Sequence, residues 1–323
     1  MPPSVPIALA AGIASALLYA SMLVLGPLLG AVPWFVSSVP LILAGLTLGR
    51  GAGLLACAAG VVAFALMSLS VVAGLLYLVS DTLPALVILS LALRPAPGVP
   101  SPQPSRPEDW YPPGEILARL ALVPPVLIVG AALLAPAHEG GLTGFLGTSI
   151  GGALQQALSA SGQDVLDPET RDAVVRNAVM LLPGMLAMSW LVRAVVAGAL
   201  AQAIARRMGR ALRPSPVYIA MQVPAWSGVL FGIVAILAVL FGGDLGYVAW
   251  SVAMGLSLPF MLLGFKLVHA VARRTPYPGM LLGVFYVVFL SVSALAIVAM
   301  VLAGLVEFLA NLRRRAAGGA SEE

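Results

Sequence analysis

The sequence predicts an all-α protein, a polytopic transmembrane bundle of about eight or nine helices. Composition is the first observation behind this prediction, because 60% of the 323 residues are hydrophobic and only 9% are charged. Soluble domains are about 45–50% apolar and about 25% charged, so no soluble core could bury this much apolar surface. The second observation is that the apolar residues form long runs. A cytosolic enzyme, a nucleic-acid-binding domain and a disordered chain are therefore excluded.

The apolar runs are interpreted as helices because backbone groups in lipid must form hydrogen bonds within their own segment. A spanning helix needs roughly 20 apolar residues. The candidate spans cover about residues 5–30, 32–48, 53–71, 72–93, 116–137, 177–204, 217–242, 246–272 and 277–309.

A proline-rich segment divides the chain. Residues 94–115 cannot form a helix with this many prolines, and we predict a cytoplasmic linker there. It separates an N-terminal membrane half of four helices, residues 1–93, from a C-terminal membrane half, residues 116–323. Within the linker, Trp110 and Tyr111 are predicted to anchor at the membrane interface.

The longest polar stretch, near residues 138–176, follows the fifth span. Its first part places apolar residues on one helical stripe, which favours an amphipathic helix at the extracytoplasmic interface over a re-entrant segment. The stripe consists of Leu142, Phe145, Leu146, Ile150, Leu154 and Leu158. Further on, Asp167 is a predicted N-cap and Pro168 the first residue of a helix that continues directly into the sixth span.

The lysines and arginines predict the orientation. With the N-terminus in the cytoplasm, most basic residues fall in cytoplasmic connections, whereas Arg171 and Arg176 face the other side. Nine spans would, however, place the basic residues 313–315 outside. Either the last run is a pair of short helices that breaks near Ser291–Ser293, or one earlier span does not cross. We expect a cytoplasmic C-terminus.

Small residues recur at helical spacing in the first three spans. Ala10 and Ala14 lie beside a second row formed by Ala8, Gly12, Ala16 and Ala20. Another row contains Gly45, Gly49 and Gly53 and crosses a tight turn at Arg50. Such rows let helix backbones approach closely, either inside the bundle or against another membrane subunit. The stretch from Pro40 to Gly53 resembles the second-to-third helix junction of the substrate-binding S-components of energy-coupling-factor transporters. This resemblance covers roughly the first 95 residues.

Polar positions near the C-terminus carry a second resemblance. They are Pro259, Gly264, Lys266, His269, Arg273, Arg274, Gly304, Glu307, Asn311 and Arg313. In this pattern the chain resembles the YybS-like family of uncharacterised bacterial membrane proteins, which carry domain of unknown function 2232. The resemblance implies a multi-pass protein of the bacterial inner membrane and no established activity. Glu307 stands where the family pattern leads us to expect an aspartate.

Two ionisable residues fall near the middle of predicted spans, Asp81 in the fourth and Arg193 in the sixth. Each alone would carry a large desolvation cost, so we expect them to pair. The pair is either structural, or it forms part of a solute or proton pathway. Pro84 nearby frees a backbone carbonyl, a feature used to line cavities.

Lys266 and His269 share one helix face, and with Glu307 they are predicted to form a cytoplasmic-side polar cluster or a site for anionic lipid headgroups. A histidine at a helix end is more often an interfacial residue than a ligand. No metal or cofactor is expected, because His138 and His269 are the only histidines and fall on opposite sides. Cys57 is a lone cysteine, which excludes a disulfide framework.

The sequence contains no G-x-x-x-x-G-K-[ST], H-E-x-x-H or G-x-S-x-G motif. We therefore expect no enzyme. The favoured hypothesis is a solute-binding or transport subunit that relies on a separate ATPase subunit. The alternative is a membrane scaffold or assembly factor whose basic cytoplasmic loops bind lipids or partner proteins.

Overall fold

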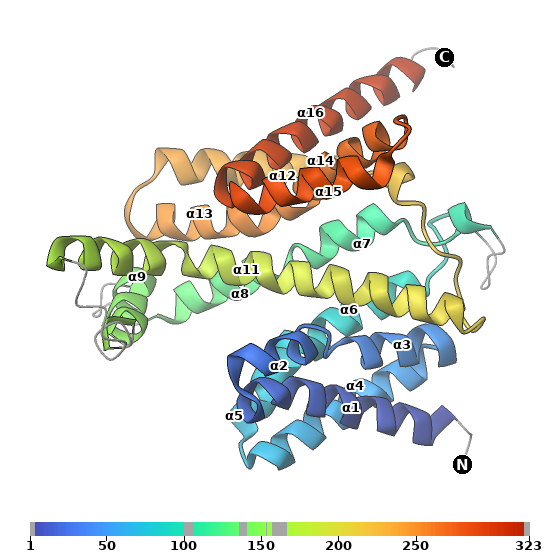
Figure 1. Cartoon of the computed structure of the whole chain (residues 1–323), viewed down its shortest axis with the longest axis horizontal. Coiled ribbons are helices and arrows are strands. Elements are labelled where there is room, and N and C mark those ends of the chain that lie inside the picture. The colour runs from blue at the N-terminus through green and yellow to red at the C-terminus, as the bar shows by residue number, and fades with distance from the viewer. Residues whose placement is uncertain (1–3, 100–105, 136–140, 153, 157–166, 320–323) are drawn as a thin grey trace. The chain divides into compact units, whose positions relative to one another are not determined.

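The computed structural model in Figure 1 describes residues 4–99, 106–135, 141–152, 154–156 and 167–319, and its regular elements there are helices. Within these described ranges, eight helical segments are long and apolar enough to cross a membrane. They are Ser4–Val24, Gly26–Leu48, Arg50–Ser68, Val71–Ala92, Pro113–Leu134, Glu169–Arg207, Gly243–Ala272 and Ser293–Arg314. Two apolar helices, Ala225–Leu240 and Pro278–Ser291, are shorter. The predicted all-α polytopic bundle is confirmed.

The helices group by their contacts into two compact units, which do not follow the order of the chain. The first unit comprises residues 1–120 and 192–223, and the second comprises residues 121–191 and 224–323. One long helix, α11 (Pro168–Arg207), contributes its first part to the second unit and its last part to the first. The predicted division into residues 1–93, 94–115 and 116–323 stays a prediction about domains.

The first unit is built from short helices that follow one another closely. They are α1 (Ser4–Val24), α2 (Gly26–Phe35), α3 (Val39–Leu48), α4 (Arg50–Ser68), α5 (Val71–Tyr77), the π-helix η1 (Leu78–Thr82), α6 (Leu83–Ala92), η2 (Pro107–Asp109), α7 (Pro113–Leu120) and the last part of α11. The first helix ends at Val24, so the predicted end near residue 30 is wrong. Gly26 has a φ of 74° and Pro27 follows it, and the two residues end one helix and start the next.

The row of small residues in α1 packs inside this unit. Ala8, Gly12, Ala16 and Ala20 are buried, and a Cβ on Gly12 would overlap the Ala56 carbonyl oxygen in α4. Close packing is thus the role of this row. Ala10, by contrast, is exposed. Ala14, in turn, is half-buried.

The glycines that follow have two different roles. Gly45 and Gly53 are buried, and a Cβ on either would overlap the Leu89 side chain of α6. Gly49 is not part of that packing face, because no atom lies within 4 Å of a Cβ built on it. Its φ of 98° instead forms the turn between α3 and α4, a conformation that favours glycine.

Trp110 and Tyr111 are buried, so the prediction that they anchor at the membrane interface is wrong. The guanidinium of buried Arg213 lies 5.9 Å from the Trp110 ring centre, and its Nη1 donates a hydrogen bond to the Ala92 carbonyl at 3.0 Å. Burial lowers the pKa of Arg213. Arg213 Nη2 also donates to the Tyr111 carbonyl at 3.4 Å, so this one cation contacts both aromatic residues.

The second unit consists of α8 (Val123–Leu134), α9 (Gly141–Leu146), the π-helix η4 (Gly147–Gly151), the first part of α11 (Pro168–Arg207), α12 (Ala225–Leu240), α13 (Gly243–Leu256), α14 (Leu258–Ala272), α15 (Pro278–Ser291) and α16 (Ser293–Gly319). The predicted span 217–242 is too long, because the helix begins only after Pro224 and has 16 residues. The predicted run 277–309 divides at Val292 into α15 and the 27-residue α16, so the predicted break near Ser291–Ser293 is confirmed, and the number of crossings stays a prediction.

The polar stretch after α8 is described in part. Residues 141–151 are helical, Leu142 is buried, and the predicted stripe residue Leu158 lies outside the described residues. The N-cap prediction is confirmed, since the Asp167 carboxylate accepts hydrogen bonds from the Thr170 backbone nitrogen at 2.8 Å and from its hydroxyl at 2.6 Å. α11 then runs for 40 residues without interruption.

In the last three helices, α15 doubles back along α14 and α16 reverses direction again (Figure 1). The reversal brings the end of α16 beside the end of α14, where Lys266 Nζ lies 3.2 Å from Glu307 Oε1. A Cβ on Gly304 would overlap the Phe260 carbonyl oxygen, so α14 and α16 meet through their backbones. Arg273 and Arg274, which follow α14, and Arg313, in the last part of α16, therefore lie beyond the same ion pair along the chain.

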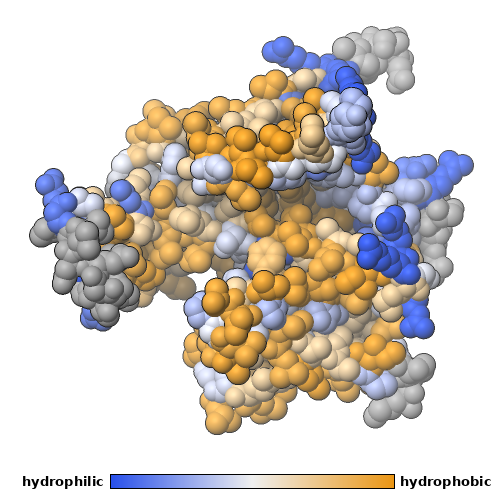
Figure 2. All heavy atoms as spheres, in the orientation of Figure 1, coloured by the Kyte–Doolittle hydropathy of each residue, from blue (hydrophilic) through white to orange (hydrophobic). Residues whose placement is uncertain are grey.

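Figure 2 shows hydrophobic residues covering the visible helix surfaces, with hydrophilic residues gathered mainly at helix ends. Large apolar side chains are exposed along these helices, including Leu28 at 89% and Val239 at 80%. Exposed apolar surface on this scale requires lipid rather than water around it.

Candidate functional site

The predicted mid-membrane pair, Asp81 and Arg193, is present in the first unit. Arg193 Nη2 donates hydrogen bonds to both carboxylate oxygens of Asp81, each at 2.7 Å. Asp81 is completely buried and Arg193 is 5% exposed. The two charges therefore compensate each other where neither can reach water.

Three serines complete the surroundings of the carboxylate. Ser37 and Ser38 donate hydrogen bonds to Asp81 Oδ1, the latter at 2.8 Å, and Ser80 donates to Oδ2 at 2.8 Å. With the two bonds from Arg193, the carboxylate accepts five hydrogen bonds. A buried carboxylate is stable when its hydrogen-bonding capacity is filled in this way.

The local backbone explains how Asp81 comes to face Arg193. Asp81 lies in the π-helix η1, where the Leu83 nitrogen bonds the Leu78 carbonyl. Pro84 lacks the N–H that would bond the carbonyl four residues earlier, so the regular α-helical pattern cannot continue through this turn. Short π-helical segments inside α-helices occur frequently at functional sites.

Aromatic side chains enclose the pair. The Arg193 guanidinium carbon lies 4.2 Å from the ring centre of Trp34, a cation–π contact. Tyr77 and Ser15 share a 2.6 Å hydrogen bond, and Ser15 also donates to the Ser37 carbonyl. Arg193 Nε has no hydrogen-bond partner among the residues that the structure describes. The arrangement braces α2, η1 and α11 within the first unit.

The second predicted cluster is present in part. Lys266 is paired with Glu307, which also accepts a hydrogen bond from Asn311 at 3.0 Å. His269 faces α15 instead, with its ring 6.1 Å from that of Tyr286 and its Nδ1 2.9 Å from the Phe265 carbonyl oxygen. Within the part of the chain that the structure describes, no group of three His, Cys, Asp or Glu residues is placed to hold a metal ion.

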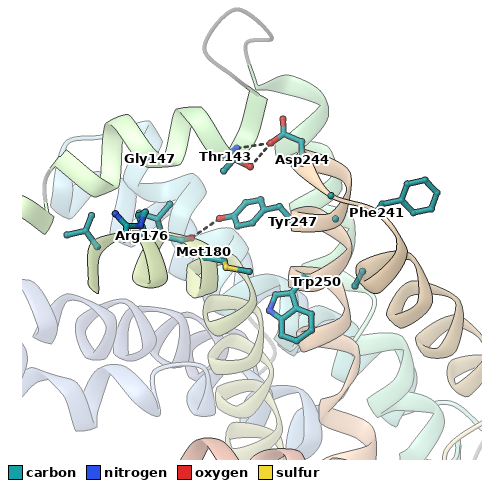
Figure 3. A pocket seen from close by; sticks show the side chains of 14 residues that line it. Thr143, Gly147, Arg176, Met180, Phe241, Asp244, Tyr247 and Trp250 are labelled. Atoms are coloured by element: carbon teal, nitrogen blue, oxygen red, sulfur yellow. Dashed lines mark hydrogen bonds between the residues drawn. The ribbon is translucent and has the colours of Figure 1, made fainter. Parts of the chain in front are cut away.

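A cavity in the second unit was not predicted from the sequence. It has a volume of about 940 Å³ and lies between α9, η4, α11, α12 and α13, and we name it the Arg176 cavity (Figure 3). It is lined by Thr143, Gly147, Val175, Arg176, Val179, Met180, Ala238, Phe241, Gly242, Gly243, Asp244, Gly246, Tyr247 and Trp250. Its lining is mainly apolar, and its charged members are Arg176 and Asp244.

Polar contacts hold the wall of this cavity in place. Asp244 in the first turn of α13 accepts two hydrogen bonds through Oδ1, from the Thr143 nitrogen at 3.2 Å and its hydroxyl at 2.5 Å. The Tyr247 hydroxyl donates to the Val179 carbonyl at 2.8 Å, which ties α13 to α11 (Figure 3). The sequence signal was weak, because Arg176 and Asp244 stand in separate polar connections and form no motif.

Comparison with known proteins bears on the whole chain. No curated protein and no solved structure matches it. The resemblance of the N-terminal half to S-components therefore stays an expectation. The family model described as "Predicted membrane protein (DUF2232)" matches residues 112–307, which include Arg193, the Lys266–Glu307 pair and the Arg176 cavity. Since this match covers more than half of the chain, the protein belongs to the DUF2232 family of predicted membrane proteins.

Proposed function

We propose that this protein is a solute-binding subunit of a membrane transport system whose energy comes from a separate ATPase subunit. The observation that supports the proposal is the Arg176 cavity. Its volume of about 940 Å³ lies within the range of roughly 300–1,000 Å³ typical of small-molecule sites. Such sites combine a mainly apolar lining with a few polar groups that orient the ligand, and this cavity has both.

The proposal includes an orientation in the bacterial inner membrane, with both termini in the cytoplasm. Arg176 and Asp244 then belong to the extracytoplasmic side, where a solute for uptake arrives. Support comes from the basic residues, because Arg273 and Arg274 after α14 and Arg313 in α16 extend beyond one shared ion pair. A single cytoplasmic side for all of them satisfies the positive-inside rule.

In this proposal the first unit serves as the anchoring part. The Asp81–Arg193 pair braces its helices, since the carboxylate is saturated by hydrogen bonds. The side of α1 that carries exposed Ala10 and half-buried Ala14 is where a coupling subunit would dock, because α4 covers the other small row.

The alternative function is a scaffold that binds anionic lipids or partner proteins. The exposed arginines Arg206, Arg207 and Arg210 at the end of α11 favour it, since clustered basic residues attract anionic headgroups. Co-purification distinguishes the two functions. An ATPase and its coupling subunit would support transport, whereas partners confined to non-transport proteins would support the scaffold.

Ligand-dependent stability tests the proposed function. The full chain in detergent is heated with a panel of metabolites, because a ligand that binds only the folded state raises the melting temperature. Ala238→Trp fills the cavity from α12, whereas Ile233→Trp is the control, since Ile233 is 52% exposed on the same helix and does not line the cavity.

We expect at least one compound to stabilise the wild type and Ile233→Trp while leaving Ala238→Trp unchanged. Two results would overturn the proposal. One is a panel in which no compound stabilises the wild type. The other is a ligand that stabilises Ala238→Trp as strongly as the wild type.

A further inference from the structure

The charges of the Arg176 cavity are of opposite sign and come from different helices. Arg176 projects from α11 and Asp244 from α13, and Figure 3 draws Tyr247 between them. Because the other lining residues are neutral, the cavity carries one positive and one negative group and no net charge. A ligand that matches it must therefore offer both signs.

Arg176 is available to an anion. Its side chain is exposed, and among the residues that the structure describes it forms no hydrogen bond or ion pair. A guanidinium offers paired N–H donors in a planar fork that fits the two oxygens of a carboxylate. A ligand carboxylate beside Arg176 would gain a charge-assisted bidentate contact.

Asp244 is held in a fixed orientation at the edge of the cavity, beside Gly141 and Thr143. Thr143 occupies Oδ1 through its nitrogen and its hydroxyl, whereas Oδ2 accepts no hydrogen bond from the described residues. Oδ2 itself packs against Gly141, whose φ is 68°, so closely that a Cβ at this position would overlap it. A carboxylate oxygen positioned in this way is an acceptor for an ammonium group.

The wall around the two charges is apolar and aromatic. Val175, Met180, Phe241 and Trp250 contribute most of the bulky side chains. These groups favour a ligand body that removes its own apolar surface from water. A strongly polar solute such as a sugar would leave this surface without a matching partner.

We infer that the Arg176 cavity binds a small zwitterion with an apolar body, of the class of short apolar peptides. Its carboxylate pairs with Arg176 and its ammonium group with Asp244, while its side chains contact the aromatic wall. This inference rests on the proposed function and deepens it by naming the solute class. A ligand with only a negative charge would be repelled by Asp244, and a ligand with only a positive charge would be repelled by Arg176.

Three probes test the inference with the full chain in detergent: trileucine, N-acetyl-trileucine and trileucine amide. The acetyl group removes the positive charge and the amide removes the negative charge, with the apolar body unchanged. Each blocking group removes one charge-assisted hydrogen bond between the ligand and the cavity. We therefore expect each blocked probe to bind about tenfold more weakly than trileucine, or worse.

Two charge variants assign each end of the ligand. Arg176→Gln is expected to bind trileucine as weakly as its amide, and Asp244→Asn is expected to bind it as weakly as its N-acetyl form. Thr143→Val removes one bond that positions Asp244 and should weaken the two probes with a free ammonium group only. Arg206→Gln, at an exposed arginine outside the cavity, is the control and should change nothing.

The outcomes separate the inference from the proposed function. Blocked probes that bind as tightly as trileucine would overturn the inference, as would charge variants that weaken all three probes equally. Another outcome is that trileucine fails to bind while a different solute binds the wild type but not Ala238→Trp. In that case the assignment of a zwitterionic ligand is wrong and the solute-binding function stands. If no compound binds the wild type, both are wrong.

Discussion

Breaking the Asp81–Arg193 pair is the sharpest structural test. Arg193→Met keeps an unbranched side chain against Trp34 but removes three hydrogen bonds from Nη2, two to the Asp81 carboxylate and a longer one to Ser37. Each charge-assisted bond contributes about 1.5–3 kcal/mol. The three serine hydrogen bonds to Asp81 remain and offset part of the loss. We therefore expect a loss of about 3 kcal/mol, at the lower end of the 3–5 kcal/mol typical when one partner of a buried pair is removed.

The assay is reversible unfolding of the full chain in mixed micelles with increasing sodium dodecyl sulfate, followed by tryptophan fluorescence. Arg206→Met is the matched control, because Arg206 is exposed at the end of the same helix. Asp81→Leu combined with Arg193→Met should cost less than either single change, since no buried charge is left unpaired. If Arg193→Met costs no more than Arg206→Met, or if the double variant costs the sum of the singles, the reasoning is refuted.

Three further predictions concern packing, capping and topology. Gly304→Val should lower unfolding stability by about 1–3 kcal/mol, because its side chain must displace the α14 backbone, whereas Gly283→Val faces open space and should change little. Hydrogen bonds from Thr170 lower the pKa of Asp167. The cap is therefore complete above the ordinary pKa near 3.8 and is lost as pH falls through the lowered value. Hydrogen exchange in the first turns of α11 should accelerate on acidification, and Asp167→Ala should exchange fast already at neutral pH. A reporter fused after Glu323 should be active only in the cytoplasm, and activity only outside the cell would contradict this topology.

The sequence predicted the fold class because hydropathy is a property of whole segments. It predicted helix ends less well, since a break inside an apolar run needs only one or two residues. Gly26 and Pro27 end the first helix within a stretch that is apolar on both sides. Pro224 similarly shortens the predicted span 217–242. Hydropathy alone does not register such breaks, because glycine and proline act through backbone conformation.

How well the sequence predicted each candidate site depends on the free-energy cost of placing its side chains in lipid. Asp81 and Arg193 stand out because an unpaired charge in a span is expensive, so their pairing followed from the sequence. The serines around them did not stand out, because Ser37 and Ser38 are neutral and common in spans. Arg176 was recognised only as a charge outside the spans, where charge is ordinary, and Asp244 lies in a connection of the same kind.

The Asp81–Arg193 pair and the Arg176 cavity differ in how many hydrogen bonds their charged groups already form. The Asp81 carboxylate already accepts hydrogen bonds from Arg193 and three serines, so a solute could engage it only by displacing those partners. The Arg176 cavity has unused bonding capacity at both charges and room for a small molecule. Binding requires groups that gain more from the ligand than they lose from their present contacts. By that criterion the Asp81–Arg193 pair stabilises the fold, and the Arg176 cavity is the better candidate for a ligand-binding site.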